Sequence, residues 1–207
     1  MDIEIQPRGV FTTLLYLIIV LLFLNIIGII SKYYFDQDYI YGLIPLFNFD
    51  TERNIPTFYS SLALISASAL LAIIASTHKK NGSAYLSWLG LAIIFLFLSI
   101  DEIASIHERI GKYFEEPFNA SGLLFFAWVI PYGAALIVFV IAYLKFLMRL
   151  PKNIMILFVV SGAIFVSGAI GVESITAKYV EIYGKNNLIY SLYYTGEEFL
   201  EMLGIVI

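Results

Sequence analysis

The chain has 207 residues, of which 60% are hydrophobic and 14% are charged, and its formal net charge at pH 7 is −4. A soluble domain carries about 25% charged residues, so this composition excludes a soluble globular protein and indicates an integral membrane protein. The acidic balance argues against nucleic acid as a partner, and the lack of cysteine excludes disulfides, thiolate metal sites and cysteine nucleophiles.

Six apolar segments follow one another along the chain. They cover residues 10–30, 56–76, 84–100, 123–148, 154–172 and 188–207. A helix needs roughly 20 residues to cross the hydrocarbon core, and each segment reaches or approaches that length. We therefore expect an all-α fold, a single polytopic bundle of six transmembrane helices over residues 1–207. The last apolar run is still continuing at Ile207, so we expect the chain to be truncated there.

The connections between the segments predict the orientation. One side carries Lys or Arg at positions 8, 79, 80, 145, 149 and 152, and the other at positions 32, 53, 109, 112, 178 and 185. The two totals are equal, but the first set is concentrated in short connections, which favours a cytoplasmic N-terminus. In either orientation, the third and fifth segments end on the side where the sixth begins.

Seven carboxylates and one histidine lie beside or inside these apolar segments. They are Asp101, Glu102, His107, Glu108, Glu173, Glu197, Glu198 and Glu201. An ionised acid at mid-membrane costs about 2.5–3.5 kcal/mol on insertion scales, so each one calls for a proton, a basic partner or a cation. Because the topology places them on one side, we expect these side chains to meet in one pocket at one membrane face.

Helical geometry predicts how the residues after the third segment are arranged. If the helix continues, Asp101 and Glu108 share one stripe, and Glu102 pairs with Arg109 on a second stripe. His107 points in a third direction, and it reaches the pocket only if the helix bends or ends there.

In the sixth segment, Glu201 is one helical turn from both Glu197 and Glu198. Two carboxylates at that spacing can bind one cation or share one proton.

Two other patterns concern packing. Small residues are frequent in the second segment, and Ala163, Ser167 and Gly171 form a small-residue stripe in the fifth, as expected where helices approach closely in lipid. Asn54 and Pro56 are typical of a helix start, and the loop before them is either an ordinary connection or a lid over the acidic cluster.

The acidic cluster admits three functions. Carboxylates with one histidine suit zinc, iron or manganese, and all-oxygen ligand sets suit calcium or magnesium. The first hypothesis is therefore a metal-binding protein or a metal-dependent membrane enzyme. Its candidate ligands are the seven carboxylates and the histidine named above. The second is a non-catalytic subunit of a larger membrane complex, in which the acids serve assembly. A purely structural interpretation is also open, in which the acids cap helices and form ion pairs at the membrane interface. The third is a cation or proton transporter. No motif marks a catalytic residue or an organic cofactor site, and the expected partners are membrane lipid and other membrane subunits.

Three segments carry a resemblance to known sequences. They are FNFDTERNIPTFYSS (residues 47–61), SIDEIASIHE (99–108) and GEEFLEMLG (196–204). Over most of its length the chain resembles an uncharacterised group of bacterial polytopic integral membrane proteins that share FxxDxExNIPTxYS- and SxDExxxxHE-like segments. The resemblance implies a bacterial inner membrane location and a sixth helix that continues past Glu201. It implies no chemistry, because the group has no assigned activity.

Overall fold

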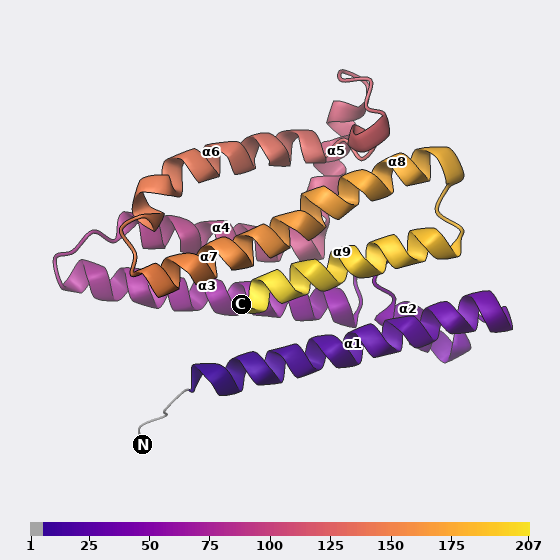
Figure 1. Ribbon diagram of the computed structural model, residues 1–207, viewed down its shortest axis with the longest axis horizontal. Coiled ribbons are helices and arrows are strands. Elements are labelled where there is room, and N and C mark those ends of the chain that lie inside the picture. The colour runs from indigo at the N-terminus through magenta and orange to yellow at the C-terminus, as the bar shows by residue number, and fades with distance from the viewer. Residues whose placement is uncertain (1–5) are drawn as a thin grey trace.

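The computed structural model describes residues 6–207, which form helices joined by short connections, with no β-strand among them. The helices, in chain order, are α1 (Pro7–Phe35), η1 (Ile40–Gly42), α2 (Leu43–Phe47), α3 (Ile55–Lys80), α4 (Leu86–Ala104), α5 (Ile106–Glu115), η2 (Gly122–Leu124), α6 (Val129–Leu147), α7 (Lys152–Val166), η3 (Ser167–Val172), α8 (Glu173–Tyr183) and α9 (Leu188–Val206). The long helices run roughly side by side (Figure 1). The prediction of an all-α fold is confirmed.

Five helical stretches among the described residues are long and apolar enough to cross a membrane. They are Pro7–Phe35, Ile55–Lys80, Leu86–Ala104, Val129–Leu147 and Lys152–Tyr183, the last of which joins α7, η3 and α8. α9 is not among them, because three glutamates interrupt its 19 residues. The predicted sixth span is therefore not confirmed, whereas the composition of the other five fits a membrane protein.

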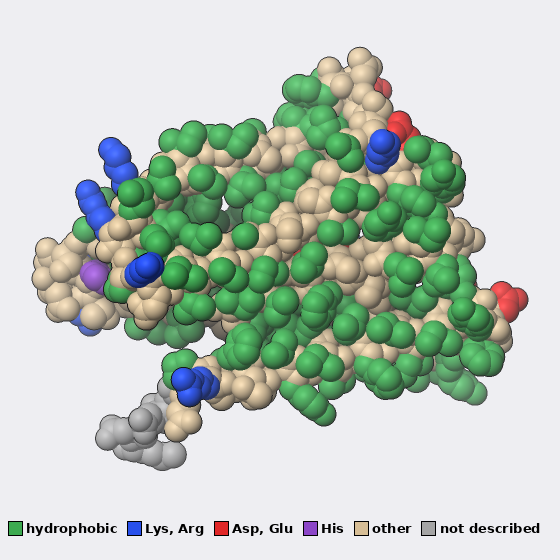
Figure 2. Space-filling model, in the orientation of Figure 1, with side chains coloured by type: hydrophobic (Ala, Val, Ile, Leu, Met, Phe, Trp, Pro, Cys, Tyr) green, Lys and Arg blue, Asp and Glu red, His purple; other side chains and the backbone are tan. Residues whose placement is uncertain are grey.

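The surface is consistent with a lipid environment. Hydrophobic side chains cover most of the face shown in Figure 2, most of the Lys and Arg side chains lie at the end where α1 begins, and Asp and Glu lie at the other end. This distribution puts the charged groups at the two ends of the helices and leaves their middle apolar.

The packing of α3 against α4 depends on serine. The Ser61 hydroxyl donates to the carbonyl oxygen of Ser99 at 2.9 Å, and the Ser99 hydroxyl donates back to the carbonyl oxygen of Ser61 at 2.9 Å. Farther along the pair, the Ser68 hydroxyl donates to the carbonyl oxygen of Ala92 at 2.7 Å. Short side chains let the two backbones approach closely, so Ser61 and Ser68 of the second segment pack as expected, whereas Ser66 and Ala69 of the same segment are exposed.

Glycine brings α9 against the α7–η3 stretch. A Cβ added to Gly204 would lie 2.6 Å from the backbone nitrogen of Phe165, and one added to Gly168 would lie 2.7 Å from the backbone oxygen of Glu197. The predicted stripe was wrong, because Ala163, Ser167 and Gly171 are exposed. On the η3 side, the close approach to α9 uses Gly168, which has no side chain, rather than its neighbour Ser167.

A buried asparagine fixes α1 to the rest of the molecule. Asn25 is 2% exposed, and its amide nitrogen donates to the Thr195 hydroxyl of α9 at 2.8 Å. Its amide oxygen accepts the backbone N–H of Phe49, in the loop between α2 and α3, at 3.0 Å. One side chain therefore links α1, α9 and the loop that borders the site.

Candidate functional site

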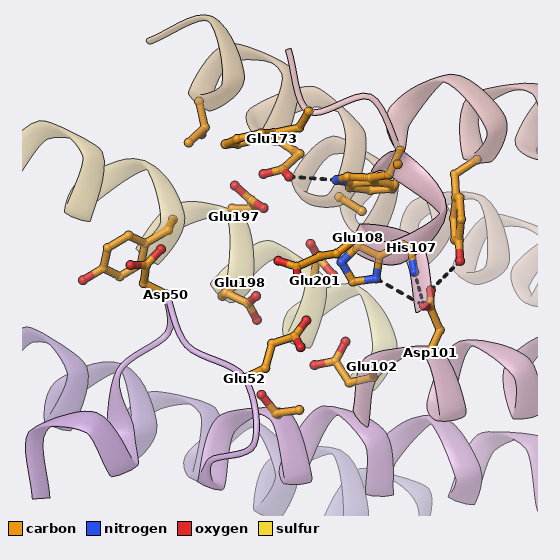
Figure 3. Close-up of a pocket in the computed structure, with 18 of the residues that line it drawn as sticks. Asp50, Glu52, Asp101, Glu102, His107, Glu108, Glu173, Glu197, Glu198 and Glu201 are labelled. Atoms are coloured by element: carbon orange, nitrogen blue, oxygen red, sulfur yellow. Dashed lines mark hydrogen bonds and ion pairs between the residues drawn. The ribbon is translucent and has the colours of Figure 1, made fainter. Parts of the chain in front are cut away.

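A cavity of about 340 Å³ lies among α3, α4, α5, α6, η3, α8 and α9 (Figure 3). Ten carboxylates line it: Asp50, Glu52, Asp101, Glu102, Glu108, Glu115, Glu173, Glu197, Glu198 and Glu201. Its basic lining consists of Lys112, Lys185 and His107. The structure thus brings together all eight residues that the sequence singled out, as the topology of the segments predicted.

The loop before α3 adds two acids that were not among the predicted site residues. Asp50 accepts a hydrogen bond from the Tyr190 hydroxyl, and Glu52 points into the cavity (Figure 3). Burial raises the pKa of Glu52, and the negative charge of Glu108 raises that pKa further. The signal in the sequence was the pair of acids directly ahead of the helix start at Asn54.

Asn54 holds this loop in place. Its side-chain oxygen accepts the backbone N–H of Thr57 at 3.1 Å, which confirms it as the N-cap of α3. Its amide nitrogen donates to the carbonyl oxygens of Asn48 and Thr51, each at 2.6 Å. The loop is therefore compact, and it places Asp50 and Glu52 on the cavity wall.

The helix of the third segment does not continue past Ala104. Ser105 has φ 51°, in the left-handed region, and α5 starts at the next residue in a new direction. The expected shared stripe of Asp101 and Glu108 is therefore wrong, and so is the Glu102–Arg109 pair, because the break removes the helical register that both needed. The break satisfies the condition for His107, which lines the cavity.

Asp101 and His107 make the one contact within salt-bridge distance found in residues 6–207, and it is an ion pair only when the imidazole is protonated. The Asp101 Oδ1 atom accepts the backbone N–H of His107 at 2.7 Å and lies 3.2 Å from its Nδ1, while Oδ2 accepts the Tyr132 hydroxyl at 2.9 Å. Burial acts to lower the pKa of His107, but the hydrogen bond and the charge of Asp101 outweigh it, so this pKa is raised.

The remaining acids come from α8 and α9. Glu173, the first residue of α8, accepts the Trp128 indole N–H at 3.0 Å. The carboxylate of Glu197 lies next to that of Glu173 (Figure 3). One carboxylate oxygen of Glu197 is buried and has no hydrogen-bond partner among residues 6–207. Glu198 and Glu201 point into the same space.

The charges of the cavity do not balance. Ten carboxylates face two lysines and one histidine, so the ionised cavity would be strongly negative. Clustered acids resist joint ionisation, and a proton or a cation relieves their repulsion. Within the described part of the chain, however, no three His, Asp or Glu side chains stand in an arrangement that would hold a metal ion. The cavity supplies oxygen ligands without a preformed coordination geometry.

Comparison with known proteins supplies a family. No curated protein and no solved structure matches the chain. One family model matches it over residues 13–207, nearly the whole length, and so includes every residue of the cavity. The chain therefore belongs to the family described as "Domain of unknown function (DUF8692)".

Proposed function

We propose that this protein is a multi-pass membrane protein that binds a divalent metal ion in its acidic cavity. The observation that carries this proposal is the excess of ten carboxylates over three basic groups in one space, with a buried oxygen of Glu197 that receives no hydrogen bond. Four unpaired ionised acids at membrane depth would cost about 10–14 kcal/mol. That is comparable to the 5–15 kcal/mol by which folded proteins are stable, so the acids must be neutralised by protons or by a cation, and we propose the cation.

A divalent ion supplies that counter-charge compactly. Carboxylate oxygens coordinate such ions at about 2.0–2.6 Å, and a carboxylate binds through one or two oxygens. Glu52, Glu198 and Glu201 come from different segments and point into one space (Figure 3). Glutamate side chains are flexible, so in this proposal they converge on the ion when it binds. This is why the proposal does not require a preformed triad.

In this proposal α9 is the sixth membrane helix, with its glutamates facing the cavity rather than lipid. The N-terminus is cytoplasmic, because the Lys and Arg residues on its side of the membrane are concentrated in short connections. The membrane is the bacterial inner membrane that the resemblance implies. The cavity then faces the extracytoplasmic side. A metal-dependent enzyme, an accessory subunit and a transporter stay predictions of the sequence, since no contact in the structure favours one of them over the others.

The test is metal content. The protein is purified in lipid nanodiscs, dialysed against Mg²⁺, Mn²⁺ or Zn²⁺, and analysed by elemental mass spectrometry. We expect one ion or more per chain in the wild type and loss of that ion in the Glu198→Gln/Glu201→Gln double variant. Glu116→Gln is the matched control, because Glu116 is exposed and lies outside the cavity lining. Absence of bound metal from the wild type, or equal metal content in the double variant and the control, overturns the proposal.

A further inference from the structure

The His107 ring is held in one orientation by its surroundings. Its Nδ1 lies 3.2 Å from Asp101, and its ring makes edge contacts with Trp128 and Tyr132 at centroid distances of 5.0 and 6.2 Å. The left-handed turn at Ser105 brings the ring back towards the end of α4. The backbone and three neighbouring side chains therefore fix the imidazole.

The other ring nitrogen remains available. With Nδ1 directed at Asp101, Nε2 lies on the opposite edge of the ring, on the side of Glu108 and Glu201 (Figure 3). His107 lines the cavity, and Nε2 has no hydrogen-bond partner among the described residues. An imidazole that donates from Nδ1 to a carboxylate is held in the tautomer whose Nε2 lone pair is free to bind a ligand.

Asp101 is less available as a ligand than the glutamates. It is 5% exposed, and its two oxygens accept from the His107 backbone, from His107 Nδ1 and from the Tyr132 hydroxyl. These three contacts use most of the acceptor positions of the carboxylate. Its role differs from that of Glu198 and Glu201, whose carboxylates point into the open cavity (Figure 3).

We infer that His107 is the nitrogen ligand of the cavity, that Asp101 positions it, and that the site consequently selects a zinc-like transition metal over Mg²⁺ or Ca²⁺. This inference rests on the proposed function and specifies its metal class. Imidazole suits Zn²⁺ and Fe²⁺, whereas Mg²⁺ and Ca²⁺ prefer oxygen ligands alone. An all-glutamate cavity would show no such preference for nitrogen-binding ions, so His107 sets the selectivity.

The test measures Zn²⁺ and Mg²⁺ dissociation constants separately by titration calorimetry of the full chain in nanodiscs. We expect His107→Gln to weaken Zn²⁺ binding at least 100-fold and Mg²⁺ binding less than 3-fold. Asp101→Asn should weaken Zn²⁺ binding 10- to 100-fold, the range found when a carboxylate partner of a metal-binding histidine is removed. The control is His78→Gln, because His78 stacks on Trp88, outside the cavity lining.

The ratio of the two affinities separates a ligand from a structural residue. A variant that merely distorts the cavity weakens both metals alike, so an unchanged Zn²⁺/Mg²⁺ ratio in His107→Gln overturns the inference and leaves metal binding intact. Absence of binding of either metal to the wild type overturns the proposed function itself. Co²⁺ provides a second readout, because replacing a nitrogen ligand shifts its visible absorption bands. Identical Co²⁺ spectra of the wild type and His107→Gln also contradict the assignment.

Discussion

Replacing Gly168 by alanine perturbs the cavity from outside its acidic lining. The added Cβ would lie 2.7 Å from the backbone oxygen of Glu197, 3.0 Å from Cγ of Glu201 and 3.1 Å from Cβ of Leu200. Ordinary van der Waals contact begins at 3.4 Å, so the helices must separate by about 0.7 Å at a point where the nearest atom belongs to the backbone. Overpacking of this kind costs about 1–3 kcal/mol. The same movement displaces two of the carboxylates that the proposed site uses.

Gly162 provides the matched control, because it lies in the same long helix and a Cβ added there meets nothing within 4 Å. Both substitutions gain about the same helix propensity, about 1 kcal/mol per glycine replaced, so this gain cancels in the comparison. We expect Gly168→Ala to be about 1–3 kcal/mol less stable than Gly162→Ala in reversible denaturant unfolding in detergent micelles. Equal unfolding free energies for the two variants would refute the close approach of η3 to α9.

Two other predictions concern the loop before α3 and its anchor in α1. Because burial and Glu108 raise the pKa of Glu52 above 4.5, the folded protein holds that proton more tightly than the unfolded chain. The unfolding free energy should then fall as the pH rises from 4.5 through the raised pKa. Over that range its decrease with pH should be shallower for Glu52→Gln than for the wild type, and parallel curves for the two proteins would contradict this. Asn25→Ala leaves the Phe49 N–H without its acceptor, so we expect a loss of about 1–3 kcal/mol in the same unfolding assay. The control is Thr12→Val, which removes an exposed hydrogen bond within α1, and a loss no larger than that of the control would be evidence against the anchor.

The sequence predicted the location of the site better than its geometry. Topology alone placed the end of the third segment, the end of the fifth and the start of the sixth on one side, so the convergence of Asp101, Glu173 and Glu197 followed from segment order. Helical periodicity could not predict the break at Ser105, because serine seldom adopts a left-handed conformation and no glycine or proline marks the turn. Every inference that assumed a continuous helix there failed, including the partner of Glu102.

The sequence did not predict Asp50 and Glu52 as site residues, for a different reason. Asp50 and Glu52 lie outside the apolar segments, and acids in a polar connection ordinarily face solvent. Their place in the cavity depends on contacts distant in sequence, namely the hydrogen bond of Tyr190 to Asp50 and that of Phe49 to Asn25. Such contacts form only when the helices have packed, so local sequence patterns carry little information about them.

Two of the irregular stretches of helix occur where the acids gather. α4 breaks at Ser105 between Asp101 and His107, and the π-helical turn Ser167–Val172 ends directly before Glu173. Irregular backbone at membrane depth is tolerated where it is buried in protein or lines a polar cavity, and π turns are frequent at functional sites. The first irregularity turns His107 back to Asp101, and the second contains Gly168, which packs against α9. At the first of these places Asp101 also accepts the backbone N–H of His107 in the first turn of α5, so the same break caps a helix and shapes the cavity. A structural cluster and a binding site therefore share this backbone, and the metal content of the protein is the measurement that separates them.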